Sequence, residues 1–202
     1  MYKAPNIRSA TSSECPHYQL LILNSKLNSM EFESKILSKS ISEMLYNSDK
    51  TLGTAESCTG GRIAEAIISV PGASDYFKGG IVSYTNEVKE SILGVSHQVL
   101  EEQTAVCEEV AKEMVIGAIK ALNVDYAVSA TGVAGPTGGT PEIPVGTIWI
   151  GYGSKDEVRT LKLSEDFGRD INLAIATNTA LKSILSFLQE HEEELKKEKN
   201  QE

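Results

Sequence analysis

The stretch Thr51-Leu52-Gly53-Thr54-Ala55-Glu56-Ser57-Cys58-Thr59-Gly60-Gly61 decides the fold of this chain. Its first five residues are typical of a short buried strand, and the next segment carries apolar residues at helical spacing, at Ile63, Ala66, Ile67 and Val70. A strand that passes into a helix through Ser, Thr and two glycines makes a sharp turn with exposed backbone N–H groups. Such a turn binds an anion or holds a nucleophile over an oxyanion hole. The alternative is that Ser57 or Thr59 only caps the helix.

Further strand and helix patterns follow in alternation. Ile81 to Tyr84 and Tyr126 to Ala130 are short apolar runs that predict two more strands, and Glu108 to Leu122 has the periodicity of an amphipathic helix. Gly146 to Tyr152 and Glu157 to Leu163 flank turn residues and predict a hairpin. Together these elements predict an α/β fold: a three-layer α/β/α sandwich with a mixed, mostly parallel sheet that contains one antiparallel strand.

Three parts of the chain differ in composition. Residues 1–29 are rich in Ser and Asn and lack clear periodicity, so we expect a disordered or loosely packed extension. A folded domain is expected over residues 30–190, with a first helix from Met30 and a last helix from about Arg169 to Glu190. Residues 191–202 form a charged tail that we expect to fray into solvent.

Bulk composition argues against several classes of protein. The formal net charge of −9 disfavours a nucleic-acid partner, which requires clustered Lys and Arg. The three cysteines, Cys15, Cys58 and Cys107, are odd in number and widely spaced, which indicates reduced thiols in a cytoplasmic protein. No apolar run is long enough to span a membrane, and the histidines lack ligand-like spacing. We therefore expect no membrane segment, no metal and no cofactor, and we expect a homo-oligomer.

Polar residues follow three of the predicted strands. Ser57, Tyr84 and Thr131 all lie at carboxyl ends, and ligands of parallel sheets bind beyond those ends. The loop from Thr131 to Thr140 matches neither a Walker A nor a dinucleotide-binding pattern. Its glycines predict either an anion-binding nest or a plain turn. The convergence of the three positions predicts one site at this edge of the sheet.

A base for Ser57 must come from a residue other than histidine, because no histidine is placed to form a Ser-His-Asp triad. Lys89 is the candidate, at the start of a helix that Thr85 or Asn86 caps. A lysine acts as a base only when its pKa falls from about 10.4 toward about 7–8. Tyr84 could relay the proton or orient the lysine. The alternative for Lys89 is an ordinary solvated side chain.

Five motifs occur in order along the chain: Ala55-Glu56-Ser57-Cys58-Thr59-Gly60-Gly61, Ser83-Tyr84-Thr85-Asn86-Glu87-Val88-Lys89, Leu93-Gly94-Val95, Ala130-Thr131-Gly132-Val133-Ala134-Gly135-Pro136 and Pro144-Val145-Gly146-Thr147. They resemble the CinA C-terminal domain family, in its stand-alone form, from about residue 32 to about residue 188. This resemblance implies a three-layer α/β/α sandwich. It also implies a nicotinamide mononucleotide (NMN) deamidase, which hydrolyses the carboxamide of NMN to nicotinate mononucleotide and ammonia.

The resemblance also implies roles for single residues. Ser57 matches the nucleophile, and Tyr84 and Lys89 match the other catalytic residues. The implied substrate-binding positions are Thr59, Gly60, Gly61, Asn86, Thr131, Gly132, Gly135 and Arg169. An oxyanion would rest on backbone N–H groups from Cys58 to Gly60, while Arg169 and the Thr131 loop would hold the ribose phosphate.

Three positions depart from the family pattern. Cys107 ends the segment Thr104-Ala105-Val106-Cys107, where the family has Gly-Ala-Val-Ser. Asn172 and Leu173 lie where the last helix of the family carries a second Arg, and Phe167 replaces part of a Gly-Asp-Arg motif.

Two other functions remain open: an amidase for another small amide, and a non-catalytic partner protein associated with competence or DNA damage.

Overall fold

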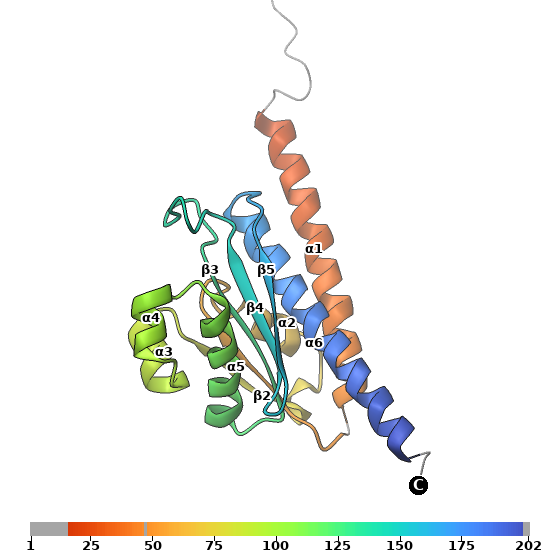
Figure 1. Cartoon of the computed structure of the whole chain (residues 1–202). Helices are drawn as coiled ribbons and strands as arrows, with labels where there is room; N and C mark the ends of the chain where they lie inside the picture. The colour runs from red at the N-terminus through yellow and green to blue at the C-terminus, as the bar shows by residue number, and fades with distance from the viewer. Residues whose placement is uncertain (1–15, 47, 200–202) are drawn as a thin grey trace, which may run out of the picture.

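The computed structural model of the chain describes residues 16–46 and 48–199, with side chains for residues 19–46 and 48–192. A five-stranded sheet lies at its centre, with the strand order β2-β1-β3-β4-β5 (Figure 1). The strands are β1 (Leu52–Glu56), β2 (Phe77–Val82), β3 (Tyr126–Gly132), β4 (Ile148–Ser154) and β5 (Val158–Leu163). β1 pairs in parallel with β2 and β3, and β4 is antiparallel to both of its neighbours. The predicted mixed sheet with one antiparallel strand is confirmed.

Helices cover both faces of the sheet, which confirms the three-layer arrangement (Figure 1). One face carries α1 (Pro16–Leu45), α2 (Arg62–Ile68) and α6 (Arg169–Lys199). The other carries α3 (Asn86–Leu93), α4 (His97–Gln103) and α5 (Glu108–Leu122). A short 3-10 helix, η2 (Ala73–Asp75), lies in the segment that joins α2 to β2.

The alternation of side chains along β1 assigns its residues to two hydrophobic cores. Leu52 belongs to the core beneath α1, α2 and α6, and Ala55 belongs to the core beneath α3, α4 and α5. Successive residues of a strand point to opposite faces. Glu56 therefore lies on the same side as Leu52, toward α2, and this places its carboxylate beside the helix that follows the Ser57 turn.

A glycine in α5 allows α3 to approach closely. A Cβ atom on Gly117 would collide with the backbone of Leu93, the last residue of α3. Because Gly117 lacks that atom, the C-terminal end of α3 packs directly on α5. This contact fixes the helix that carries Lys89 relative to the sheet.

The first helix is longer than the sequence predicts. It begins at Pro16 and not at Met30, so residues 16–29, which the sequence predicts to be disordered or loosely packed, are helical, while residues 1–15 lie outside the described part of the chain. The described side chains from residue 19 to residue 29 are mostly exposed, whereas Ile41 and Leu45 are buried. Once a helix is nucleated by packing, each further residue adds one hydrogen bond, so a helix extends beyond its packed half.

The last helix also continues beyond its predicted end. α6 runs to Lys199, so residues 191–199, which the sequence predicts to fray into solvent, are helical; residues 200–202 lie outside the described part. Over Arg169–Glu192 the helix is long and apolar enough to cross a membrane by length and composition alone. Since 61% of that window is buried against the rest of the protein, its apolar residues are those of a core helix.

Two short elements have no clear signal in the sequence. Residues His97–Gln103 form α4, whose first turn is capped by the Ser96 hydroxyl, which accepts a hydrogen bond from the Val99 N–H. The segment from Pro71 to Asp75 contains η2. Helices of a single turn or two carry too few apolar residues for their periodicity to be detected.

Candidate active site

The backbone around Ser57 is fixed by the sheet and by two glycines. The Ser57 N–H donates to the Ala130 carbonyl at 2.8 Å, which extends the β1–β3 pairing beyond the strand end. The Gly60 N–H then donates to the Ser57 carbonyl at 3.2 Å, and Gly60 and Gly61 have φ values of 62° and 99°. Glycine adopts this left-handed region without a steric penalty. The tight turn therefore leaves the Ser57 side chain pointing away from the helix start.

The cap of α2 comes from Glu56 and not from the turn. Its carboxylate accepts hydrogen bonds from the N–H groups of Gly61 (2.9 Å), Ile63 (3.1 Å) and Ala64 (2.9 Å). The N-cap residue, Gly61, makes no side-chain cap. The alternative that Ser57 or Thr59 merely caps this helix is therefore wrong, and the Ser57 hydroxyl is available for another role.

Lys89 reaches the Ser57 hydroxyl from the opposite layer. Its Nζ atom donates to Ser57 Oγ at 3.1 Å and to the Ser83 carbonyl at 2.8 Å. Thr85 is the N-cap of α3, as predicted, and accepts from the Val88 N–H. Lys89 is 1% exposed, so the alternative of a solvated surface lysine is wrong.

The protonation of Lys89 is set by burial. Removal from water lowers the pKa of its amine below the usual 10.5, and the nearby Cys58 offsets this only in part. No carboxylate pairs with Lys89 in the part of the chain that the structure describes. A lysine that is desolvated and unpaired loses its proton more readily, which is the state that a general base needs.

Cys58 lies next to Ser57 but is a poor nucleophile. Burial raises the pKa of its thiol to about 12, so the sulfur stays protonated at neutral pH. The thiolate is the reactive form of cysteine. Of the two neighbouring side chains, the hydroxyl of Ser57 is therefore the one with a base beside it.

Tyr84 lies at the open side of the site. Its side chain is 67% exposed, and it makes no hydrogen bond with Ser57 or Lys89. A direct relay between Tyr84 and Lys89 is therefore absent from this arrangement. Tyr84 lines the pocket from its edge.

The glycine loop after β3 is held by contacts with two other segments. The Thr131 hydroxyl donates to the Ala105 carbonyl at 2.7 Å, and Arg169 Nη1 donates to the Gly135 carbonyl at 2.8 Å. The buried Asn172 donates to the Ala134 carbonyl at 3.1 Å. These contacts fix the loop at the carboxyl end of β3, so its backbone can present a defined surface to a ligand.

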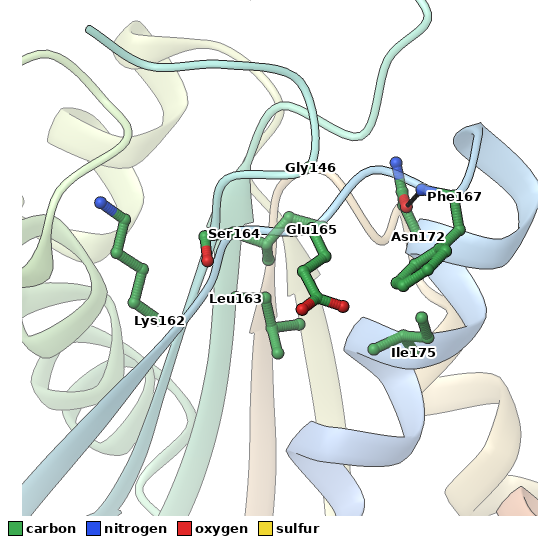
Figure 2. Close-up of a pocket in the computed structure, with 9 residues that line it drawn as sticks. Gly146, Lys162, Leu163, Ser164, Glu165, Phe167, Asn172 and Ile175 are labelled. Carbon is green, nitrogen blue, oxygen red and sulfur yellow. Dashed lines mark hydrogen bonds between the residues drawn. The ribbon is translucent and has the colours of Figure 1, made fainter.

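Asn172 also connects this loop to a neighbouring cavity of about 300 Å³ (Figure 2). Its Oδ1 accepts from the Phe167 N–H at 2.9 Å, and its Nδ2 donates to Asp166 at 2.8 Å. Leu163 and Glu165, from the end of β5, face Ile175 of α6 across this cavity (Figure 2). Neither Ser57 nor Lys89 lines it, so we assign the candidate active site to the pocket that contains them.

That pocket has a volume of about 310 Å³ and brings together most of the predicted residues. The predicted residues that line it are Ser57, Tyr84, Asn86, Lys89, Thr131, Gly132, Gly135 and Arg169. Thr59, Gly60 and Gly61 do not line it: Thr59 is buried in the turn, the Gly60 N–H donates to the Ser57 carbonyl, and the Gly61 N–H donates to Glu56. Their expected contact with substrate is not supported by this geometry.

Seven further residues line the pocket: Cys58, Ala105, Val106, Val133, Ala134, Thr137 and Gly138. Five of them lie in segments that the sequence analysis assigned to the site, the Ser57 turn and the loop from Thr131 to Thr140, and only Ala105 and Val106 were missed. These two residues lie outside both segments and carry no glycine-rich pattern. They reach the pocket because Thr104 has a φ of 67°, which turns the chain sharply after α4.

The charged side chains that line the pocket are basic, although the whole chain has a net charge of −9. Lys89 and Arg169 line it, and no Asp or Glu does so among the described residues. No group of three His, Cys, Asp or Glu that could hold a metal occurs in the described part of the chain. This electrostatic pattern favours an anionic ligand.

Cys107 takes over the capping role expected of serine. It is the N-cap residue of α5, and its sulfur accepts from the Val110 N–H at 3.5 Å. The departure from Ser at this position thus keeps the start of α5 in place. The neighbouring carbonyl of Ala105 remains available to Thr131.

The fold and the buried Ser–Lys pair define an α/β protein of the CinA type. A family model for the CinA C-terminal domain matches residues 34–188, and the chain belongs to this family. A CinA-like protein of Leptospira borgpetersenii is 56% identical over 114 residues, which are 56% of this chain and 27% of that relative. A CinA-like protein of Cytophaga hutchinsonii is 42% identical over 159 residues, covering 79% of this chain and 38% of that relative. The chain thus spans well under half the length of these curated relatives.

Solved structures of the same superfamily have the same fold. The competence/damage inducible protein CihA from Agrobacterium tumefaciens has a TM-score of 0.71 and 31% identity, covering 78% of this chain and 94% of that one. A CinA superfamily protein from Escherichia coli has a TM-score of 0.68 and 36% identity, covering 77% of this chain and 88% of that one. The resemblance of the motifs to this family is confirmed.

Proposed function

We propose that this protein hydrolyses the carboxamide of NMN to nicotinate mononucleotide and ammonia. The observation that carries the proposal is the 3.1 Å hydrogen bond between Lys89 Nζ and Ser57 Oγ, two buried groups that line a pocket to which no described Asp or Glu contributes. Ser–Lys pairs are an established variant of serine catalysis. The pyridinium ring of NMN withdraws electrons from its carboxamide, which makes the carbonyl carbon a better target for a hydroxyl.

The first half of the reaction forms an ester on Ser57. Neutral Lys89 accepts the proton of the hydroxyl across the same 3.1 Å as Ser57 Oγ attacks the carbonyl carbon. The protonated lysine then gives this proton to the departing amide nitrogen as the C–N bond breaks, and ammonia leaves. Because Tyr84 has no contact with Lys89, we give the proton transfer to Lys89 and place Tyr84 beside the substrate at the pocket mouth.

The oxyanion of the tetrahedral intermediate would be held by the backbone N–H group of Cys58, which lines the pocket. Of the other two expected donors, Thr59 does not line the pocket, and the Gly60 N–H is engaged with the Ser57 carbonyl at 3.2 Å. A single donor to an oxyanion contributes about 3–4 kcal/mol to the stability of the transition state. The Cys58 N–H lies next to the attacking atom in the chain.

The second half of the reaction releases the ester. Lys89 accepts a proton from water as the water oxygen attacks the acyl carbon, and it returns that proton to Ser57 Oγ as the ester bond breaks. The ribose phosphate would lie at the other end of the pocket, near Arg169 and the loop from Gly132 to Gly138. In the described structure the backbone N–H groups of Thr137 and Gly138 donate to no carbonyl, so they can donate to phosphate oxygens.

An ammonia-release assay on a panel of pyridine compounds tests this function. We expect NMN to be hydrolysed at the highest kcat/KM, and nicotinamide riboside, which lacks the phosphate, to have a much higher KM. Preferential hydrolysis of an uncharged amide would instead indicate an amidase for another small amide. No ammonia from any compound of the panel would contradict the proposal.

A further inference from the structure

We propose that Glu56 is the positioning residue of this site. The inference rests on the proposed function for its kinetic test, but it starts from a geometric observation. A carboxylate that is 1% exposed lies directly before the candidate nucleophile and accepts three backbone N–H groups from the helix beyond it.

The three hydrogen bonds close a ring around the catalytic turn. Glu56 ends β1, and its acceptor contacts begin at Gly61, so the side chain bridges across Ser57 and the three residues that follow it. Thr54 lies two residues earlier on the same side of β1, and its hydroxyl donates a further hydrogen bond to Glu56 Oε1 at 3.3 Å. Strand, turn and helix are thus joined through one side chain, and the turn cannot open without breaking these bonds.

A cap alone does not require this arrangement. Ser, Thr, Asp or Asn at the N-cap satisfies a helix start through its own short side chain. Here the N-cap is Gly61 with a φ of 99°, a conformation that those residues rarely adopt. The side chain that caps α2 therefore comes from β1. Gly61 keeps the backbone conformation that the turn requires, and the helix lacks a conventional N-cap side chain.

Glu56→Gln tests the positioning role, because it keeps the size of the side chain but replaces one acceptor oxygen with a donor. Asp125→Asn is the matched control. Asp125 lies before β3 and accepts from the N–H and hydroxyl of Thr51, both at 2.8 Å, at the amino end of the sheet. Both variants weaken a carboxylate that ties one segment to another, but only Glu56 borders the candidate site.

We expect Glu56→Gln to lower kcat about 10²-fold with KM within about twofold, as for a nucleophile displaced by about 1 Å. Asp125→Asn should keep kcat. The second-order rate of Ser57 labelling by a serine-reactive fluorophosphonate should fall in parallel in Glu56→Gln, and this measurement does not depend on NMN hydrolysis. Thr54→Val, a milder change, should lower both rates in the same direction.

If Glu56→Gln loses melting temperature as Asp125→Asn does but keeps its labelling rate, the positioning role is wrong.

The two proposals can fail separately. A wild-type protein that labels at Ser57 but releases no ammonia from NMN would contradict the proposed substrate. The positioning role of Glu56 would then be decided by the labelling rates of the wild type and Glu56→Gln. A wild-type protein that does not label at Ser57 would overturn the premise that this turn presents a reactive serine, and the Glu56 inference with it.

Discussion

Lys89 Nζ lies 3.1 Å from Ser57 Oγ and 2.8 Å from the Ser83 carbonyl, with only 1% of the lysine exposed. Burying an ammonium group without a carboxylate destabilises a folded protein. A lysine in such a position lowers the stability of the folded protein. Its amine also loses its proton more readily and can then act as a base. This relationship between Lys89 and Ser57 is the basis of the first two predictions.

Lys89→Met should raise the free energy of unfolding by about 1 kcal/mol near neutral pH while abolishing ammonia release. The pKa of Lys89 is lower in the folded than in the unfolded protein, so the unfolded state binds more protons between the two values. The loss of stability that the buried Lys89 amine causes is complete below the pKa of Lys89 in the folded protein, and it disappears as the pH rises toward 10.5. Thermal melts of both proteins from pH 6 to 10.5 should therefore converge. A variant that melts below the wild type at pH 6 would contradict this prediction.

Lys89→Arg should be nearly as inactive as Lys89→Met, because a guanidinium keeps its proton. In the wild type, kcat/KM should rise with pH through the lowered pKa of Lys89 and reach its plateau below the free-lysine value of about 10.4. Lys162→Arg, on an exposed lysine of β5, is the matched control and should leave the profile unchanged. An active Lys89→Arg enzyme would show that Lys89 is an electrostatic anchor and not the base.

Arg169→Ala should raise the KM for NMN about tenfold or more and change kcat much less, because its guanidinium lies at the phosphate end of the pocket. Arg62→Ala is the matched control. Arg62 is the first residue of α2, as Arg169 is the first residue of α6, but it does not line this pocket. Steady-state kinetics with NMN and with nicotinamide riboside separate the two effects. An equal KM for both substrates in the wild type would contradict a phosphate site at Arg169.

Deletion of residues 1–29 should leave kcat/KM unchanged and shift the melting temperature little. The packed half of α1 contains Ile41 and Leu45, whereas the described side chains from residue 19 to residue 29 are mostly exposed. Activity, melting temperature and sedimentation of the truncated and full chains provide the comparison. A large loss of melting temperature would show that this half of α1 packs on the domain or on a neighbouring subunit, and a change of oligomeric state would identify the neighbouring subunit.

The sequence was sufficient for the sheet because each strand has a local signal. β1 and β3 are short apolar runs, and the strand–turn–helix transition at Ser57 carries two glycines with positive φ. Lys89 could be placed near Ser57 because both follow predicted strands that end at the same edge of a parallel sheet. Such relationships depend on topology, which the order of elements largely determines.

The role of Glu56 could not be predicted in the same way. A glutamate beside a serine has no pattern that distinguishes a buried cap from a solvated carboxylate, and the usual capping rules consider residues at the helix start. Its hydrogen-bond partners, between Gly61 and Ala64, come within reach of the Glu56 carboxylate only after the turn folds. The direction of Tyr84 likewise depends on tertiary packing, which leaves its side chain 67% exposed.

The most direct test of the central claim compares ammonia release from NMN by the wild type, Ser57→Ala and Cys58→Ala. The account predicts a loss of kcat of about 10³-fold or more in Ser57→Ala, with an unchanged melting temperature, because one hydroxyl is removed. Cys58→Ala should retain most of the activity, since its thiol, with a pKa of about 12, is not the nucleophile. An active Ser57→Ala enzyme, or an inactive Cys58→Ala enzyme that folds normally, would contradict the assignment of Ser57 as the nucleophile.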